Sequence, residues 1–359
     1  MYSVDPDISA ASTLPPAFYR DGAAYVATLE RAFARSWQWL GRIDDVAAKG
    51  TLAPRDLLPD SLDEPLLLAR DGAGTLRCLS NVCTHRGNIL VKSACAADQI
   101  RCGYHSRRFD LEGKMVFMPE FVGVKDFPSV RDDLPQVPFA TWKGHGFAAL
   151  DPFASFEDVF AAMNARMSWL PIESFTHRPG RDREFEIAAH WALYVENYLE
   201  GFHIPFVHAS LNKVVDYGSY SSELFAFSNL QLALAKDGEP AFAPPPGCPD
   251  HGRRVAAYYW WIFPNLMLNF YPWGLSVNLV QPCGIGRTRV SFRSFVGEAS
   301  HLDSGAGSGL DRVEAEDEAI VLAVQRGVRS RLYRGGRYSP TRERGVHHFH
   351  RLLADGLGV

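Results

Sequence analysis

The spacing of apolar residues changes along the chain. From Tyr19 to Trp37 an apolar residue recurs every three or four positions, a pattern that predicts an amphipathic helix. From about Leu40 to Pro152 the pattern becomes short apolar runs separated by turn residues, as in LLLARDGAGTLRCLSNV. This second segment is therefore expected to form a small β domain.

The remainder of the chain combines helical and strand patterns. A helix and several long alternating or aromatic strands are expected in Arg183–His208, Ser219–Leu234 and Val255–Val296. Glu314–Tyr333 predicts a helix with acidic residues at its start and arginines at its end, as the helix dipole favours. The Gly/Ser-rich segment Gly297–Gly309 is expected to be a mobile loop. The second domain is thus predicted to be α+β.

Length and composition fit two globular domains. The 359 residues, 47% of them hydrophobic and 22% charged, are enough to bury a sizeable core. The formal net charge of -4 is spread along the chain, and no basic run of five or more residues occurs. Nucleic acid is therefore not an expected partner, and small molecules or proteins fit better.

No targeting or membrane segment is predicted. The N-terminus has acidic residues where a signal peptide carries basic ones, and no apolar region follows, so a cytoplasmic protein is expected. Residues 256–285 are uncharged and long enough to suggest a membrane span. Pro264, Pro272 and the many β-favouring aromatic residues in this tract instead predict buried strands joined by turns.

Six cysteines raise the question of metal binding. In a cytoplasmic protein they are expected to be thiols or metal ligands rather than disulfides. Two short motifs, Cys83-Thr84-His85 and Cys102-Gly103-Tyr104-His105, are separated by sixteen residues. These side chains could bind zinc, but zinc loops usually contain a Cys-x₂-Cys pair, and here each loop supplies one cysteine and one histidine. Such a mixed pair suits a [2Fe–2S] cluster with two thiolates on one iron and two imidazoles on the other.

The sequences CTHRGN and CGYH together resemble the motif of Rieske proteins. The resemblance implies that Cys83, His85, Cys102 and His105 hold one [2Fe–2S] cluster. Rieske proteins of respiratory complexes carry an extra cysteine in each loop. Because this chain has neither, it is similar to the lower-potential type found in oxygenases and ferredoxins. It departs from many oxygenases at Ser106-Arg107, where Gly-Trp is common, but this difference leaves the ligands intact.

A second set of candidate ligands lies in the segment ENYLEGFHIPFVH. His203 and His208 stand at the end of a helical pattern, and Pro205 is expected to break or distort this helix so that both rings could reach one ion. For an isolated pair, two buried, hydrogen-bonded histidines would be the simpler explanation. The segment, however, resembles the (D/E)-x₂-H-x₄-H motif of Rieske oxygenase α subunits. The resemblance implies that His203 and His208 bind a mononuclear Fe(II).

That family completes a two-histidine, one-carboxylate iron site with a downstream acid. The acidic run 314–318, followed by AVQRG, resembles the downstream segment and implies Asp317 as the third ligand, with Glu316 as its rival. Glu200 stands where the family carries the acid that links the two metal centres across a subunit boundary. A surface carboxylate is the alternative for Glu200. The family's Asn-Trp-Lys is here His190-Trp191-Ala192, so the roles of that Asn and Lys are not carried over.

A third cluster of candidate ligands is formed by His347, His348 and His350. Three histidines within four residues of a helix cannot all face one ion. Packing or capping near the C-terminus is the simpler interpretation.

The two motifs, in the expected order, extend the resemblance over nearly the whole chain. It implies an α+β protein with an N-terminal Rieske domain (39–155) and a C-terminal helix-grip, START-like catalytic domain with an antiparallel sheet (156–359). Residues 1–38 are expected to form a helical segment that packs on the catalytic domain. The implied function is that of a terminal oxygenase that uses O₂. A separate NAD(P)H-dependent reductase, sometimes with a ferredoxin, would supply the electrons, and family members are commonly homotrimers.

The resemblance leaves the substrate and the reaction open. The tract YYWWIFPNLMLNFYPWG could stack an aromatic ring or enclose a quaternary ammonium by cation–π attraction, although core packing explains most of it. FPNLMLN, NLVQP, VQRG and HHFHRLL are similar to enzymes of the choline monooxygenase type. Monooxygenation, dioxygenation and oxidative demethylation are all compatible. The alternatives are a Rieske-type electron-transfer protein without oxygenase activity and a zinc-stabilised binding protein.

Overall fold

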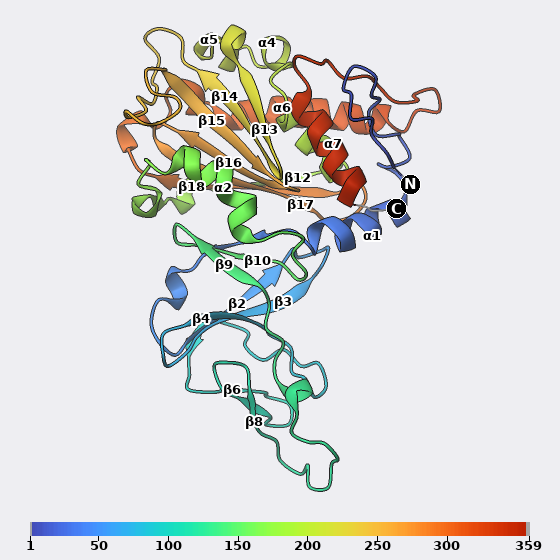
Figure 1. Ribbon diagram of the computed structural model, residues 1–359, viewed down its shortest axis with the longest axis vertical. Coiled ribbons are helices and arrows are strands. Elements are labelled where there is room, and N and C mark those ends of the chain that lie inside the picture. Colours follow the sequence, from blue (N-terminus) through green and yellow to red (C-terminus); the bar gives the residue numbers. More distant parts are fainter. Residues whose placement is uncertain (1, 357–359) are drawn as a thin grey trace. The chain divides into compact units, whose positions relative to one another are not determined.

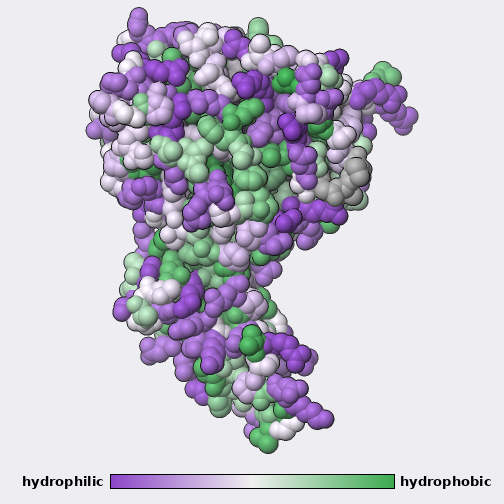
Figure 2. Space-filling model, viewed as in Figure 1, coloured by the Kyte–Doolittle hydropathy of each residue, from purple (hydrophilic) through white to green (hydrophobic). Residues whose placement is uncertain are grey.

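The computed structural model describes residues 2–356, and the chain folds into two compact units (Figure 1). The smaller unit comprises residues 34–153. The larger unit combines the N-terminal segment up to Phe33 with the chain from Ala154 onward. On the face shown in Figure 2 hydrophilic residues dominate, with hydrophobic residues among them in the middle of the larger unit.

The smaller unit consists of three antiparallel sheets in residues 34–153, with strand orders β1-β10-β9, β4-β3-β2-β5 and β6-β7-β8. The strands are β1 Gln38–Arg42, β2 Thr51–Leu57, β3 Glu64–Arg70, β4 Leu76–Ser80, β5 Cys95–Ala96, β6 Ile100–Arg101, β7 Arg108–Phe109, β8 Met115–Phe117, β9 Phe139–Trp142 and β10 His145–Ala148. Two 3-10 turns, η2 Asp44–Val46 and η3 Val130–Asp132, lie between them.

Strand β3 separates the two apolar clusters of this unit. Leu66 and Leu68 pack into one cluster with Leu40, whereas Leu67 and Ala69 pack into the other. This alternation follows from the two-residue repeat of a strand, which sends successive side chains to opposite faces. Both faces of β3 are therefore buried, and the predicted small β domain is confirmed.

In the described part of the larger unit, eight strands form one antiparallel sheet with the order β11-β18-β17-β16-β15-β14-β13, and β12 also pairs with β18. The strands are β11 Thr176–His177, β12 Arg183–Ile187, β13 Ser221–Phe225, β14 Ser228–Leu234, β15 Val255–Ile262, β16 Leu266–Tyr271, β17 Gly274–Pro282 and β18 Thr288–Val296. The apolar tract 256–285 thus forms buried strands, as predicted. None of the helices in residues 2–356 has the length and apolarity that crossing a bilayer requires.

Helices border this sheet in Figure 1. The α-helices are α1 Gly22–Thr28, α2 Phe156–Met167, α3 Trp191–Tyr198, α4 Ile204–Val207, α5 Leu211–Val214, α6 Leu310–Gly327 and α7 Arg344–Gly356. Single turns are η1 Leu29–Phe33, η4 Ile172–Ser174, η5 Pro179–Arg181, η6 Tyr217–Ser219, η7 Ala299–His301 and η8 Gly305–Gly307. Helix α2 contacts β14 and β15, α7 contacts β13, and α3 contacts both β17 and α6. The α+β prediction is confirmed.

One face of the sheet carries a row of polar side chains. Gln231, Tyr259, Asn269 and Ser276 are register partners on four adjacent strands, β14 to β17, so they point to the same side. All four line a pocket together with residues of α3 and α6. Polar residues on an interior sheet face are costly unless they serve a ligand or one another, and this row marks where the site lies.

The first predicted helix is shorter than expected. The Asp21 side chain accepts a hydrogen bond from the N–H of Ala23 and caps α1, so the helix begins at Gly22 rather than Tyr19. The chain then widens into the π-helical turn η1, which ends at Phe33. Trp37 is therefore outside the helix.

The predicted helix 314–333 starts earlier and ends earlier in the structure, because α6 runs from Leu310 to Gly327. Gly309 has a left-handed φ of 62° and ends the preceding loop there. Asp311 is then the acidic residue of the first turn, and the run 314–318 lies farther along the helix. The expectation that this run starts the helix was wrong.

The Gly/Ser-rich segment 297–309 contains two 3-10 turns, η7 and η8. Gly305, Ala306 and Gly307 are buried, and a Cβ on Gly307 would lie 2.2 Å from Nε1 of Trp273. The segment therefore packs against the larger unit at η8. Its mobility stays a prediction.

His190 caps helix α3 from a fully buried position. The ring Nδ1 of His190 accepts a hydrogen bond from the backbone N–H of Ala192 at 3.3 Å. The backbone N–H of His190 donates to Oε1 of Gln325 at 2.7 Å. Burial lowers the pKa of His190 to about 3. The folded protein therefore keeps the ring neutral at pH values where the unfolded chain protonates it.

We predict that His190 makes the larger unit sensitive to mild acid. As pH falls below the unfolded-state pKa of about 6.5, the unfolded chain binds a proton that the folded chain does not, and the free energy of unfolding falls. Replacing His190 with Asn keeps a capping acceptor but removes this titration. Between about pH 6.5 and pH 5, wild type should lose about 1.5 kcal/mol more than His190→Asn in denaturant unfolding. Parallel pH profiles for the two proteins would contradict this.

Candidate metal centres and substrate pocket

Two loops of the smaller unit carry the cysteine–histidine motifs. Cys83 lies in the loop after β4, and Cys102 follows β6 directly. Each cysteine opens a matching turn: the N–H of Gly87 donates to the carbonyl of Cys83 at 3.0 Å, and that of Ser106 to the carbonyl of Cys102 at 3.1 Å. Gly87 (φ 70°) and Ser106 (φ 58°) are both left-handed. At position 106 the left-handed backbone of serine costs about 1 kcal/mol, a cost that glycine avoids at position 87.

The four candidate cluster ligands lie together. The thiols of Cys83 and Cys102 are 2% exposed and interact with each other, and the rings of His85 and His105 are 4.8 Å apart between centroids. Burial opposes ionisation of Cys102, but backbone N–H groups of its loop outweigh it and lower the thiol's pKa. Burial, together with nearby positive groups, lowers the pKa of His85 and favours its neutral ring. Burial raises the pKa of the Cys83 thiol. The lowered pKa of Cys102 and the neutral ring of His85 fit a Rieske cluster.

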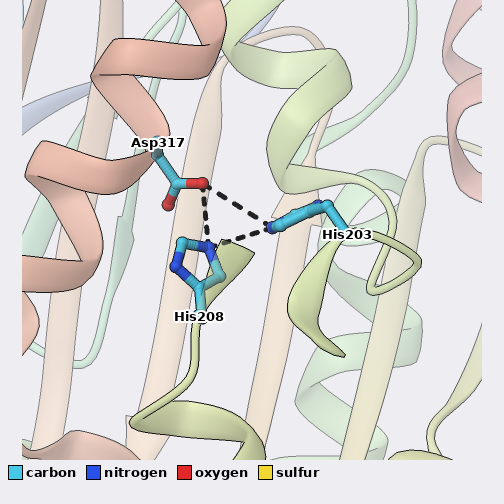
Figure 3. Close-up of side chains that lie close together, drawn as sticks. All are labelled: His203, His208 and Asp317. Carbon is cyan, nitrogen blue, oxygen red and sulfur yellow. Dashed lines mark hydrogen bonds and ion pairs between the residues drawn. The ribbon is translucent and has the colours of Figure 1, made fainter. Parts of the chain in front are cut away.

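Three side chains of the larger unit converge on one point (Figure 3). His203 and His208 are the N-cap and C-cap of the one-turn helix α4, and Asp317 comes from α6. The two Nε2 atoms are 3.1 Å apart, and Oδ1 of Asp317 lies 3.0 Å from Nε2 of His208 and 3.6 Å from that of His203. The helix α3 already ends at Tyr198, so the predicted helix break precedes Pro205, which instead lies in the first turn of α4, after Ile204.

A carboxylate oxygen lies beside the Nδ1 atom of each histidine ring, on the side away from the converging Nε2 atoms. Nδ1 of His203 is 2.6 Å from Oε1 of Glu200, and Nδ1 of His208 is 2.7 Å from Oε2 of Glu316. Because a carboxylate accepts, each Nδ1 carries the proton, and the two Nε2 lone pairs face each other. Facing lone pairs beside a carboxylate repel unless a cation lies between them, and a carboxylate behind each histidine is typical of metal ligands. These residues fit the two-histidine, one-carboxylate set that binds Fe(II).

The geometry separates Asp317 from its rival Glu316. Asp317 points to the Nε2 atoms, whereas Glu316 lies behind His208 at the other ring nitrogen. The amide of Asn197 donates to Oδ1 of Asp317 at 2.6 Å and holds this oxygen toward the histidines. Burial opposes protonation of His208, but Asp317 and Glu316 outweigh it and raise the pKa of the ring. This arrangement supports Asp317 as the third ligand and Glu316 as the residue that orients His208.

Glu200 is built into the same site. One of its oxygens contacts the His203 ring, and the other accepts hydrogen bonds from the backbone N–H groups of Phe202 and His203. The tight turn depends on Gly201, where a Cβ would lie 2.5 Å from the Tyr220 ring. The side chain of Glu200 is 14% exposed. It is therefore an ordered partner of His203, and its link to a second metal centre stays a prediction.

A pocket adjoins the three converging side chains. Five of its described lining residues are tyrosines, which come from α3, the start of β13, β15 and β16: Tyr194, Tyr198, Tyr220, Tyr259 and Tyr271. Burial raises the pKa of all five, so their rings are neutral. None of the described residues that line the pocket is Lys or Arg. The aromatic tract contributes Tyr259 and Tyr271 to this pocket.

Sequence reasoning missed two contacts of this site. Asn197 stands three residues before Glu200, and Glu314 stands three residues before Asp317. Helical spacing could have suggested both, since residues three apart share a helix face. Burial raises the pKa of Glu314 to about 8, although the hydroxyl of Tyr194 donates to it at 2.6 Å and opposes the shift. A buried carboxyl at this spacing is visible only once the fold is known.

The C-terminal histidines lie on α7 and pack as expected. Nε2 of His347 is 2.8 Å from the carbonyl of Asp5. His350 lies between the hydroxyl of Tyr338 (2.6 Å) and Oε1 of Glu196 (3.0 Å). These contacts link the N-terminal segment and helix α3 to helix α7. In the described chain these histidines belong to no candidate metal group.

Comparison with known families accounts for both sets of candidate metal ligands. Residues 168–358, more than half of the chain, match the family described as ring hydroxylating alpha subunit (catalytic domain). Residues 36–128 match the Rieske [2Fe-2S] domain. The chain belongs to the Rieske-type oxygenase α subunits. The oxygenase therefore carries a [2Fe–2S] cluster and a mononuclear iron and uses O₂, a small-molecule substrate and a reductase.

The oxygenase has curated relatives along nearly its full length. It is 29% identical to the chloroplastic choline monooxygenase of Arabidopsis thaliana, over 97% of this chain and 83% of that protein. It is 28% identical to the carnitine monooxygenase oxygenase subunit of Escherichia coli (strain K12), over 96% of this chain and 93% of that protein. The catalytic-domain match and these relatives support a terminal oxygenase and give no support to an electron-transfer protein or a zinc-stabilised binding protein.

Solved structures show the same fold. A quaternary ammonium Rieske monooxygenase has a TM-score of 0.77 and 23% identity, covering 98% of this chain and 96% of its own. Naphthalene 1,2-dioxygenase from Rhodococcus sp. has a TM-score of 0.73 and 19% identity, covering 96% and 94% of the two chains. The fold is therefore common to oxygenases with very different substrates.

We predict that Asp317 and Glu316 respond differently to loss of charge. Asp317→Asn should fail to hold mononuclear iron, because it removes a direct donor. Glu316→Gln should still fill with Fe(II), at an affinity weaker by about ten- to 100-fold, because it alters only the residue behind His208. Ferrous titration with iron and sulfide analysis measures both. Full iron in Asp317→Asn together with none in Glu316→Gln would reverse the assignment.

Proposed function

We propose that this oxygenase oxidises a small quaternary ammonium compound in the pocket beside His203, His208 and Asp317. The observation that carries the proposal is the pocket itself, which has five neutral tyrosines and no Lys or Arg among its described lining residues. Faces of neutral aromatic rings attract a cation, most strongly where water is excluded. The relatives that act on choline and carnitine by name support the same substrate class.

The tyrosines are fixed so that their hydroxyls are occupied elsewhere. The hydroxyl of Tyr198 donates to Oδ1 of Asn269 at 2.6 Å, and that of Tyr220 to Oε1 of Gln231 at 3.3 Å. Tyr259 and Tyr271 meet edge to face, with ring centroids 5.8 Å apart. Side chains held in this way present ring surface to a ligand without rearrangement. Amides and hydroxyls in the wall also make the pocket less suited to an aromatic hydrocarbon.

Bound Fe(II) supplies the site of O₂ reduction, with electrons from the Rieske cluster. In the proposal, Cys83, His85, Cys102 and His105 hold that cluster. The protein's own groups prepare the iron site: Glu200 and Glu316 keep a proton on each Nδ1, and so both Nε2 atoms remain free to bind metal. We further propose that Glu200 connects this site to the cluster of a neighbouring subunit in a homotrimer. A separate NAD(P)H-dependent reductase, with or without a ferredoxin, supplies the electrons.

The proposed domain roles follow the two motifs. We propose a cluster domain over residues 39–155 and a catalytic domain over 156–359. Of the first 38 residues, those up to Phe33 lie in the larger unit, whereas Gln38 already belongs to β1 of the smaller unit. Within the larger unit, Tyr19 supports packing of this segment on the catalytic domain, because its hydroxyl donates to Oε1 of Glu196 on α3 at 2.7 Å. The N-terminal segment thereby braces the helix that precedes the iron-site histidines.

Substrate-dependent O₂ consumption tests the substrate class. The purified oxygenase, with a Rieske-type reductase and NADH, is assayed with trimethylammonium compounds and with aromatic acids and hydrocarbons. We expect O₂ uptake and a hydroxylated or demethylated product only with the trimethylammonium set. His208→Ala should abolish uptake while the Rieske EPR signal after dithionite persists. Turnover of the aromatic set alone would reject the proposed substrate class.

Glu200→Gln tests the proposed link between centres. The amide keeps the shape of the side chain but loses the negative charge beside His203 Nδ1. We expect the cluster and the iron to remain bound, with single-turnover transfer of electrons from the cluster slowed by about ten- to 100-fold. Glu316→Gln is the matched control, because it removes the corresponding charge behind His208. Equal slowing in both variants would assign Glu200 an orienting role only.

A further inference from the structure

The buried carboxyl of Glu314 is not explained by iron binding. Glu314 lies on α6, is 6% exposed and lines the tyrosine pocket. Its Oε2 accepts a hydrogen bond from the hydroxyl of Tyr194 at 2.6 Å. Its Oε1 is buried and has no hydrogen-bond partner in the described part of the chain. An unpartnered oxygen of a buried carboxyl is costly to desolvate unless a ligand compensates it.

The other carboxylates of the pocket wall are already committed. Glu200 accepts from His203 and from backbone N–H groups, and Asp317 faces the two imidazoles and accepts from Asn197. Glu314 stands one helical turn before Asp317 on the same face of α6. Of these three carboxyls, only Glu314 has a buried oxygen without a partner in the described chain. Burial raises its pKa to about 8, so the carboxyl is largely protonated near neutral pH while no cation lies beside it.

Nearby arginines do not supply the missing charge. Arg181 and Arg183 line a second cavity that shares Glu314 with the tyrosine pocket. Arg181 pairs with Asp303 at 2.6 Å, and Arg183 pairs with Asp311 at 3.2 Å. These two ion pairs are balanced without Glu314. Neither arginine pairs with Glu314, and a cationic ligand in the tyrosine pocket would favour the ionised form of its carboxyl.

We propose that Glu314 is a specificity-determining residue whose buried carboxylate lies beside the positively charged methyl groups of a bound quaternary ammonium substrate. The inference rests on the proposed substrate class and deepens it. The tyrosine rings attract a cation but also accept an uncharged group of the same shape, because their contact is partly dispersion. The carboxyl adds discrimination by charge, because a cation stabilises its ionised form and an uncharged ligand does not. Glu314 therefore selects charge, and the rings select shape.

Paired ligands that differ only in charge measure this selection. The probes are choline and carnitine, each compared with its carbon isostere, in which a tert-butyl group replaces trimethylammonium and removes the positive charge. Dissociation constants are measured on the iron-loaded holoenzyme without reductant, by calorimetry. In Glu314→Gln the amide keeps the volume and an acceptor for Tyr194. We expect wild type to prefer a cationic probe by about tenfold or more, and Glu314→Gln to lose most of this preference.

Glu318→Gln is the matched control. It removes a carboxylate from the same helix, and Glu318 does not line either cavity described here. Its charge preference should equal that of wild type, and iron and sulfide contents should be the same in all three proteins. Rescue of the preference by Glu314→Asp, with weaker binding, would further support a direct contact with the ligand.

The possible outcomes distinguish the role of Glu314 from the proposed substrate class. A cation preference that persists in Glu314→Gln overturns the role of Glu314 while leaving the substrate class intact. Loss of binding to both members of a pair in Glu314→Gln also overturns it, because Glu314 would then only position Tyr194. If wild type prefers no cationic probe and consumes no O₂ with trimethylammonium compounds, the proposed function fails as well.

Discussion

The catalytic half of this oxygenase depends on one electrostatic constraint: two imidazole lone pairs and a carboxylate oxygen must face the same point. The Nε2 atoms of His203 and His208 are only 3.1 Å apart. This proximity is sustained because Glu200 and Glu316 hold the protons at the far side of each ring. Without those carboxylates, either ring could turn or take the other tautomer, and a metal would lose a ligand.

Much of the surrounding fold serves to hold these groups in place. The one-turn helix α4 places its two capping histidines on the same side, and α6 brings Asp317 against them from more than a hundred residues away. Helix α3 contacts α6 and supplies Asn197, which orients Asp317. The same helix carries Tyr194 and Tyr198 into the pocket wall. The position of the candidate metal ligands and the shape of the adjoining pocket are thus coupled through α3 and α6.

The charge of the pocket follows from the same architecture. The carboxyl side chains of Glu200, Glu314 and Asp317 lie in a wall that has neither Lys nor Arg among its described members. Neutral tyrosines, kept un-ionised by burial, add ring faces to it. In the proposed function, these carboxyls and ring faces together favour a cationic ligand.

Much of this could be predicted from the sequence, because ligand motifs are local. Cys83-Thr84-His85 and the His203–His208 spacing identify donor types within a few residues, and alternation of apolar residues indicates buried strands directly. The sequence pattern predicted the start of α6 too late, because acidic residues within a helix resemble a helix start. The left-handed Gly309, which precedes the true start, gives only a weak sequence signal. Whether Asp317 or Glu316 faces the histidines, and that Glu314 is buried without a partner, depended on the rotation and packing of α6. Those are properties of contacts between distant segments, and only the tertiary structure decided them.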